Sequence, residues 1–293
     1  MKFVRPSIKP VALGEIAQKF NSSTTQTDQK ITGITHNTKS VEKGDLFVAL
    51  GGEKNHGAQF VAEAKANGAV AVLTDSIGAK VIGESDLPVL VLENTRHLLG
   101  EISSFVFGNP SHFLQVFGIT GTNGKTTAAW LMRAGLEKCG IKTSLLGTAG
   151  ISIGGTNLPS ARTTPEAPEL QALLALALEK GSKAVSMEVS SHALSFERIN
   201  GTRFTCAGFT NLSQDHLDFH KNMDNYFAAK AQLFTAQYAQ KAVITNIDSW
   251  GKKLIAKTQI PFVTLGGDVE SDWRVTDITA ALGHVYFEVI DPR

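Results

Sequence analysis

The stretch that decides the fold is Gly118-Ile119-Thr120-Gly121-Thr122-Asn123-Gly124-Lys125-Thr126-Thr127, which joins a strand-like run (115–120) to a helical run (125–139). Glycines let backbone N–H groups close around phosphate oxygens, and the N-terminus of the following helix adds positive potential. Lys125 can reach the β- and γ-phosphates of a nucleotide, and the Thr126 hydroxyl can bind Mg²⁺. The stretch therefore predicts a phosphate-binding loop whose cofactor-binding residues are Gly121, Thr122, Asn123, Gly124, Lys125, Thr126 and Thr127.

This loop departs from the general P-loop pattern. That pattern places a glycine five residues before Gly124, where this chain has Ile119 between Gly118 and Gly121. We interpret the stretch as a compact relative of the general loop. The alternative is a glycine-rich turn that leads into an ordinary helix.

The segments after the loop alternate between strand and helix patterns. We expect strands at 142–146, 184–189, 206–211 and 242–246, helices at 165–180 and 224–236, and a hairpin through Gly154-Gly155. This alternation predicts a mostly parallel sheet covered by helices on both faces. Two later runs, 273–278 and 284–290, predict an antiparallel hairpin.

A Gly-Asn-Pro break at 108–110 predicts a domain boundary. Before it, the patterns predict a small α/β domain with strands at 45–50, 69–74 and 88–92 and helices at 58–67 and 96–105. The first three dozen residues carry no clear pattern. The expected fold class is α/β, with a small N-terminal domain (1–110) followed by a P-loop-containing, mostly parallel-sheet domain (111–293).

Composition narrows the class of protein. The 293 residues are 42% hydrophobic and 19% charged, as in ordinary globular proteins. A net charge of +1 does not favour nucleic acid as a partner, and no apolar run is long enough for a signal peptide or a membrane span. Two cysteines, Cys139 and Cys206, fit neither a disulfide framework nor a metal site. We expect a cytoplasmic monomer.

Three further segments carry groups that could act with the loop. Glu188 closes the strand at 184–189, where a carboxylate can hold Mg²⁺; the alternative is a solvated charge or an ion pair. The segment 215–220 (DHLDFH) fits a transition-metal site or a polar helix start capped by Asp215. Lys230 lies on an apolar helix and by itself reads as a surface lysine that reaches solvent.

Together these motifs resemble a known family. GITGTNGKTT (118–127) resembles the ATP loop of the Mur ligase and folylpolyglutamate synthetase superfamily. Three segments resemble the Mur ligases that add a diamino acid, the MurE type: TTP (163–165), MEVSSHAL (187–194) and NLSQDHLDFH (211–220). The resemblance runs from about Gly33 to the end of the chain, and it implies ATP and Mg²⁺ as cofactors.

The resemblance also implies roles for particular side chains. Lys230 carries CO₂ as a carbamate in the family, and partial burial favours this chemistry because it favours the neutral amine. The implied catalytic residues are Lys125, Glu188, His216 and Lys230, and the implied metal ligands are Thr126, Glu188, His216 and the Lys230 carbamate. Asn246 occupies the adenine-contact position; the alternative for its segment is a helix cap, which Asp248 could provide.

A further group is expected to bind the UDP-sugar substrate. Hydroxyls and a guanidinium suit pyrophosphate and carboxylate groups. The residues implied are Thr38, Lys54, Asn55, His56, Thr163, Thr164, Ser190 and Arg198. The chain departs from the family at Phe196 (commonly Gln), at Arg162 (often Asn) and at 37–39 (Asn-Thr-Lys for Asp-Ser-Arg). The alternative for 35–39 and 54–57 is a plain surface loop.

The reaction implied is ATP-dependent amide formation in cytoplasmic peptidoglycan precursor synthesis. The partners expected are UDP-N-acetylmuramoyl-L-alanyl-D-glutamate and a free diamino acid, meso-diaminopimelate rather than L-lysine. No segment resembles the family's third domain, which selects the amino acid, so we expect this chain alone to be inactive. The rivals are a sister Mur or folylpolyglutamate-type ligase, which MEVSSHAL and TTP disfavour, and a non-catalytic nucleotide-binding protein.

Overall fold

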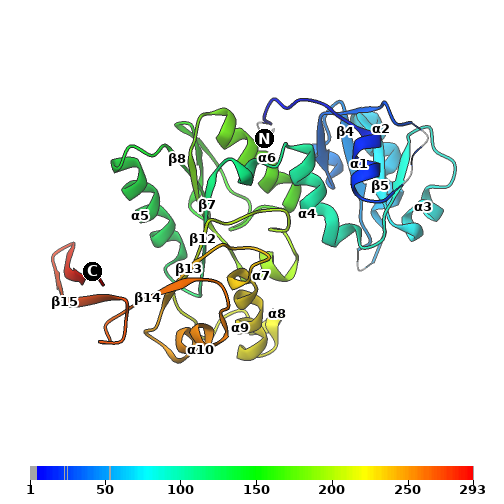
Figure 1. Ribbon diagram of the computed structural model, residues 1–293. Helices are drawn as coiled ribbons and strands as arrows, with labels where there is room; N and C mark the ends of the chain where they lie inside the picture. Colours follow the sequence, from blue (N-terminus) through cyan, green and yellow to red (C-terminus); the bar gives the residue numbers. More distant parts are fainter. Residues whose placement is uncertain (1–4, 23, 25, 53, 293) are drawn as a thin grey trace. The chain divides into compact units, whose positions relative to one another are not determined.

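The structure is a computed structural model that describes residues 5–22, 24, 26–52 and 54–292 (Figure 1). The chain divides into two compact units. The first comprises Met1–Phe113, Pro165–Gly181 and Glu197–Thr202, and the second comprises Leu114–Thr164, Ser182–Phe196 and Arg203–Arg293. The sequence does not single out the two short later segments that group with the first unit. A functional division at residues 110/111 stays a prediction.

The first unit is built on a four-stranded parallel sheet. Its order is β3 (Gly33–Thr35), β4 (Asp45–Ala49), β5 (Ala69–Thr74) and β6 (Val89–Val91). A two-stranded antiparallel ribbon pairs β1 (Val11–Ala12) with β2 (Lys30–Ile31). The helices of this unit are α1 (Leu13–Lys19), α2 (Val61–Asn67), α3 (Ser76–Ile82), α4 (Thr95–Val106) and α6 (Ala167–Glu179). Their buried aliphatic side chains form the core with the strands.

The second unit contains a ten-stranded sheet in the order β10-β9-β8-β11-β7-β12-β13-β14-β15-β16. The strands from β8 to β15 in this order run parallel, and antiparallel partners close both ends. Their bounds are β7 (Gln115–Thr120), β8 (Thr143–Gly147), β9 (Gly150–Ile153), β10 (Thr156–Leu158), β11 (Ala184–Glu188), β12 (Cys206–Phe209), β13 (Ala242–Thr245), β14 (Phe262–Gly266), β15 (Trp273–Ala281) and β16 (His284–Ile290). The prediction of an α/β fold with a mostly parallel P-loop sheet is confirmed.

Helices of the second unit carry the groups of interest. They are α5 (Lys125–Lys138), α7 (Ser191–Ser195), α8 (Leu217–His220), α9 (Met223–Ala231) and α10 (Ser249–Lys257). Helix α5 packs on the sheet through buried Ala129, which clusters with Ile119 and Leu145. No helix among the described residues is long and apolar enough to cross a membrane.

Two expected helices differ from the structure in the same way, because each contains a tighter 3₁₀ turn. The run 58–67 begins as 3₁₀ helix Gly57–Phe60 and becomes α-helical only at Val61. The run 224–236 ends as 3₁₀ helix Gln232–Phe234. Such turns are common at helix ends, where the i→i+4 bonds are not all available. The elements α3 and β14 are among those that were not predicted, and α10 was anticipated only as a helix start capped by Asp248.

Candidate phosphate and metal site

The register of three parallel strands brings the predicted loop and the predicted carboxylate to one edge of the sheet. Strand β7 lies between β11 and β12, with Glu188 opposite Ile119 and Phe209 opposite Thr120. The loop after β7, the carboxylate that ends β11 and the segment after β12 therefore emerge side by side. Ligands of open α/β sheets bind at this carboxyl edge.

The loop needs its first glycine for both conformation and space. Gly121 has φ 148°, and a Cβ added there would lie 1.9 Å from Thr210 Oγ1. The segment after β12 holds the loop, because Thr122 N donates to Asn211 O at 2.9 Å and Asn123 N donates to Asn211 Oδ1 at 3.0 Å. The glycine-rich turn is thus a fixed part of the sheet edge that leads directly into α5.

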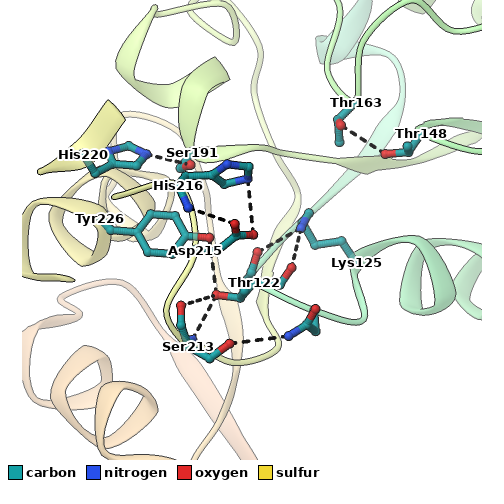
Figure 2. Close-up of polar contacts among 12 residues, drawn as sticks. Thr122, Lys125, Thr148, Thr163, Ser191, Ser213, Asp215, His216, His220 and Tyr226 are labelled. Atoms are coloured by element: carbon teal, nitrogen blue, oxygen red, sulfur yellow. Dashed lines mark hydrogen bonds and ion pairs between the residues drawn. The ribbon is translucent and has the colours of Figure 1, made fainter. Parts of the chain in front are cut away.

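Lys125 folds back over this loop (Figure 2). Its Nζ donates to Gly121 O at 3.0 Å and to Thr122 O at 2.9 Å. Burial lowers the pKa of Lys125, whereas the carboxylates of Glu188 and Asp215 act to raise it. The oxygens of a phosphate bound in this loop could therefore take the place of the two loop carbonyls as hydrogen-bond partners of the Lys125 ammonium.

Lys230 reaches the same carbonyl from α9. Its Nζ donates to Gly121 O at 2.8 Å, and its side chain is only 1% exposed. The ring of Tyr226 lies 4.5 Å from that nitrogen. Burial, and then the neighbouring charge of Lys125, lower the pKa of Lys230 to about 7. The reading of Lys230 as a surface lysine is therefore wrong, since the helix directs it into the site.

Glu188 is buried at 1% exposure and is held by neutral donors. Thr126 Oγ1 donates to its Oε2 at 2.9 Å, and Thr148 N donates to its Oε1 at 2.7 Å. The alternative of a solvated charge is excluded by the burial. No ion pair of Glu188 is found among the described residues, although Lys125 lies within its electrostatic field.

The oxygens of Thr126 and Glu188 fit a magnesium ion. Mg²⁺ prefers octahedral oxygen ligands at about 2.1 Å, so adjacent ligands lie roughly 2.9 Å apart. The measured separation between Thr126 Oγ1 and Glu188 Oε2 is 2.9 Å. A cation between them would need only the hydroxyl hydrogen to turn away.

No contact joins His216 to Glu188 among the described residues. Its Nε2 is 3.4 Å from Asp215 Oδ2 (Figure 2). Its ring meets the ring of His192 edge-on at 4.9 Å. No group of three or more His, Cys, Asp or Glu side chains that could hold a metal occurs in the described part of the chain. The N-cap of α8 is His216, so the alternative that Asp215 caps this helix is wrong.

His220, on α8, is buried and bonded to α7. Its Nε2 lies 2.9 Å from Ser191 Oγ (Figure 2). Burial lowers the pKa of His220 to about 4, and the charges of His192 and Lys230 act in the same direction. The neutral ring thus joins the segment 191–195 to the segment 215–220.

The expected substrate residues of the second unit lie beside Glu188. Thr164 Oγ1 donates to Glu188 O at 2.9 Å and accepts from Ser190 N at 3.0 Å. Ser190 also caps α7, because its Oγ accepts from Ala193 N. Thr163 Oγ1 lies 3.1 Å from Thr148 Oγ1. The structure therefore brings Thr163, Thr164 and Ser190 together with Glu188.

The remaining expected substrate residues belong to the first unit. Arg198 Nε lies 2.8 Å from Glu166 Oε1. Thr38 begins a 3₁₀ turn, and Lys54 and Asn55 are exposed. Both ring nitrogens of His56 are engaged, since Nδ1 accepts from Ala58 N at 3.1 Å and Nε2 lies 3.1 Å from Asp75 Oδ1. His56 therefore holds its loop in place, and its role as a substrate contact stays a prediction.

The side-chain amide of Asn246 is buried, and its nitrogen forms a hydrogen bond. Its Nδ2 donates to Ser271 Oγ at 2.9 Å, while Oδ1 has no hydrogen-bond partner among the described residues. Asp248 caps α10 by accepting from Gly251 N at 2.6 Å, as the alternative for this segment proposed.

Two residues of the site were missed from the sequence. Thr148 follows β8 and bonds both Glu188 and Thr163. Tyr226 lies against Lys230, and its hydroxyl is 3.3 Å from Thr122 Oγ1 (Figure 2). The signal for Thr148 was its place after a strand ending in glycine, at the edge where ligands bind.

The parallel sheet, the glycine-rich loop and the paired Thr126 and Glu188 oxygens define a P-loop nucleotide-binding protein. Residues 119–292 match the Mur ligase middle domain, and residues 30–106 match a domain described as "Mur ligase family, catalytic domain". The chain belongs to the Mur ligase family.

Relatives of known function agree with this. The chain is 44% identical over 292 residues to the UDP-N-acetylmuramoyl-L-alanyl-D-glutamate–2,6-diaminopimelate ligase of Streptomyces avermitilis, covering 99% of this chain and 58% of that relative. The ligase of the same description from Aquifex aeolicus is 43% identical, with 83% of this chain and 50% of that protein covered. The matches thus span 50–58% of the length of these relatives.

Solved structures share the fold. A structure described as UDP-N-acetylmuramoyl-L-alanyl-D-glutamate–2,6-diaminopimelate ligase matches with a TM-score of 0.80 and 28% identity, over 97% of this chain and 58% of that one. MurF from Acinetobacter baumannii matches with a TM-score of 0.72 at 19% identity, over 98% of this chain and 59% of that one, which shows a common fold alone.

Proposed function

We propose that this chain supplies the nucleotide-binding and UDP-sugar-binding parts of a ligase that adds 2,6-diaminopimelate to UDP-N-acetylmuramoyl-L-alanyl-D-glutamate. The relatives whose names state this reaction are up to 45% identical to the chain. One relative of 42% identity, from Leifsonia xyli, is described only as a UDP-N-acetylmuramyl-tripeptide synthetase. Diaminopimelate is therefore favoured over L-lysine by the relatives and not by any residue of this chain.

The observation that carries the proposal is the convergence of two lysines on one carbonyl of the phosphate loop. Lys125 and Lys230 both donate to Gly121 O, at 3.0 and 2.8 Å. A loop that only holds a nucleotide has no need of a second, fully buried amine beside its own lysine. A phosphoryl-transfer site can use both groups, because the Lys125 ammonium would neutralise charge as the phosphoryl group moves, while the Lys230 amine could become a carbamate that holds Mg²⁺.

In this scheme the chain positions ATP and the acceptor carboxylate. The glutamyl carboxylate of the precursor attacks the γ-phosphorus, the bond to the β,γ-bridging oxygen breaks, and ADP leaves an acyl phosphate. The amine of the diamino acid then displaces phosphate to form the amide. Lys125 stabilises the charge on the transferred group. Asn246 Oδ1, a buried acceptor, suits the amino group of adenine.

Thr126 and Glu188 are the residues proposed to hold Mg²⁺, which would supply positive charge beside the phosphates. His216 is proposed to hold a second Mg²⁺ by family resemblance. Lys230 is proposed to carry a carbamate. Its pKa of about 7 leaves a large share of neutral amine at neutral pH, and neutral amine is the form that reacts with CO₂.

The residues proposed to bind the UDP-sugar occur in both units. Thr163, Thr164 and Ser190 present hydroxyls at the sheet edge, and Arg198 presents a guanidinium. The candidates for the uridine end are Thr38, Lys54, Asn55 and His56. The cytoplasm is the proposed location, since precursor and ATP are both found there.

Phosphate release by the complete protein tests the proposal. With the UDP-muramoyl dipeptide and Mg·ATP present, release should depend on added meso-diaminopimelate, and a tripeptide product should appear by mass spectrometry. L-Lysine and D-alanyl-D-alanine serve as matched alternatives. Release that requires D-alanyl-D-alanine together with a UDP-muramoyl tripeptide would assign a sister ligase, and release with no amine would contradict ligase function.

A further inference from the structure

Four side chains form a continuous hydrogen-bonded relay along the carboxyl edge of the sheet. Thr126 Oγ1 donates to Glu188 Oε2 at 2.9 Å, and Thr148 Oγ1 lies 3.3 Å from that same oxygen. Thr148 Oγ1 also lies 3.1 Å from Thr163 Oγ1 (Figure 2). The relay thus connects the phosphate loop, through one carboxylate, to the segment proposed to bind the UDP-sugar.

The relay has two possible arrangements of hydrogen atoms. A threonine hydroxyl has a single hydrogen, so Thr148 can donate to Glu188 or to Thr163 but not to both. While Thr148 donates to Glu188, the hydrogen of Thr163 is directed at the Thr148 oxygen. Once Thr148 donates to Thr163 instead, the hydrogen of Thr163 is free to donate to a ligand.

A cation at Glu188 selects the second arrangement. The cation occupies the carboxylate oxygen that accepts from Thr148, and its charge repels a hydroxyl hydrogen pointed at it. The released Thr163 hydrogen then suits an anionic oxygen, such as that of a pyrophosphate or carboxylate group. Thr148 is therefore the link through which the two ends of the relay affect each other.

We propose that Thr148 is a positioning residue that couples a divalent cation at Glu188 to an anionic ligand at Thr163, so that each strengthens the binding of the other. The inference rests on the proposed function of these two ends. Coupling of this kind is reciprocal, so either ligand can be titrated against the other.

The backbone hydrogen bond of Thr148 to Glu188 allows the side-chain hydroxyl to be removed while this contact is kept. Thr148 N donates to Glu188 Oε1 at 2.7 Å, and this bond survives in Thr148→Val, which has nearly the same shape but no hydroxyl. The carboxylate therefore keeps its position while the relay is cut. Thr148→Ser retains the hydroxyl and tests for rescue. Thr156→Val removes an exposed hydroxyl of β10, outside the relay, and serves as the matched control.

Calorimetry on the 293-residue chain provides the test. The Kd of UDP-N-acetylmuramoyl-L-alanyl-D-glutamate is measured with and without saturating Mg²⁺ and the ATP analogue AMPPCP. The ratio of the two Kd values should be about fivefold in the wild type, as expected for one hydrogen bond. It should fall near one in Thr148→Val and stay high in Thr148→Ser and Thr156→Val.

The outcomes of this experiment distinguish failure of the coupling through Thr148 from failure of the proposed function. Thr163→Val cuts the relay at its other end, and it should also bring the ratio near one if Thr148→Val does not fold. A wild-type ratio retained in Thr148→Val, or a wild-type ratio of one with both ligands bound, would overturn the coupling and leave the proposed function standing. Absence of binding of both ligands to the wild type would overturn the proposed function as well.

Discussion

Gly121 O accepts hydrogen bonds from two lysines, one from the phosphate loop and one from α9. Two ammonium groups so close repel each other, and one of them is fully buried, so the arrangement favours loss of a proton from Lys230. The same pair offers an incoming nucleotide the ammonium of Lys125 and an amine, that of Lys230, which can be protonated or neutral near pH 7.

Lys125→Ala should weaken nucleotide binding strongly. The variant removes the charged donor nearest the phosphates, a loss of about 1.5–3 kcal/mol, or roughly tenfold to a hundredfold in affinity. Binding of the UDP-muramoyl dipeptide should be nearly unchanged, because its proposed contacts lie elsewhere. Calorimetry with each ligand measures both, and Lys138→Ala, at the exposed end of α5, is the control. Equal loss of both ligands would indicate a folding defect and remove support for the assignment.

Lys230 should make stability depend on pH in a defined window. Its folded pKa is about 7 against an ordinary value of 10.5, so between these values the unfolded chain binds a proton that the folded chain does not. Stability relative to Lys230→Met should therefore rise with pH across this window, by at most about 1.4 kcal/mol per pH unit, and level off below pH 7.

Urea unfolding at several pH values in CO₂-free buffer measures this difference. Lys252→Met, which removes an exposed lysine of α10, controls for loss of a charge. Parallel pH profiles for wild type and Lys230→Met would contradict the buried, neutral amine and weaken the case for a carbamate. Rescue of the activity of Lys230→Ala by acetate, in the complete protein, would support the carbamate directly.

The turn between β7 and α5 requires a glycine at position 121. Gly121→Ala would place a Cβ 1.9 Å from Thr210 Oγ1 at a φ of 148° that side chains disfavour. We expect a loss of about 1–3 kcal/mol in stability and of most nucleotide affinity. Gly135→Ala, in the last turn of α5 with no atom outside that part of the helix within 4 Å of the added Cβ, should instead stabilise the protein by about 0.5–1 kcal/mol. Denaturant unfolding and nucleotide titration of both variants decide the point, and full nucleotide affinity in Gly121→Ala would contradict the fold of the loop.

Much of the carboxyl edge of the sheet could be predicted, because the pattern of apolar residues indicates where each strand ends. The strands at 69–74 and 115–120 have the predicted bounds, and Glu188 was placed on the site because it closes a strand. Helix α3 was not predicted, because seven residues hold too few periodic positions, and its cap, Asp75, was the available signal. Helix α10 was anticipated only through its possible cap, Asp248.

Side-chain partnerships far apart in sequence could not be predicted. His56 meets Asp75 across 19 residues, and both of its ring nitrogens are thereby used within the protein. Thr148 meets Glu188 across 40 residues. Such pairs depend on strand register, which a pattern of apolar residues does not specify to the single residue.

Across the whole chain, the family matches cover residues 30–106 and 119–292 in turn. Residues proposed to bind substrate occur in each unit, and the chain spans 58% of the length of its Streptomyces avermitilis relative. We expect these residues to bind the UDP-sugar and Mg·ATP.

Calorimetric titration of the 293-residue chain with UDP-N-acetylmuramoyl-L-alanyl-D-glutamate, in the presence of Mg²⁺ and AMPPCP, tests the ligase assignment most directly. We predict one binding site for the dipeptide precursor and weaker binding of UDP-N-acetylmuramoyl-L-alanine, which lacks the acceptor glutamate. Binding of Mg·AMPPCP with no binding of either UDP-sugar would contradict the assignment and leave a nucleotide-binding protein of another function.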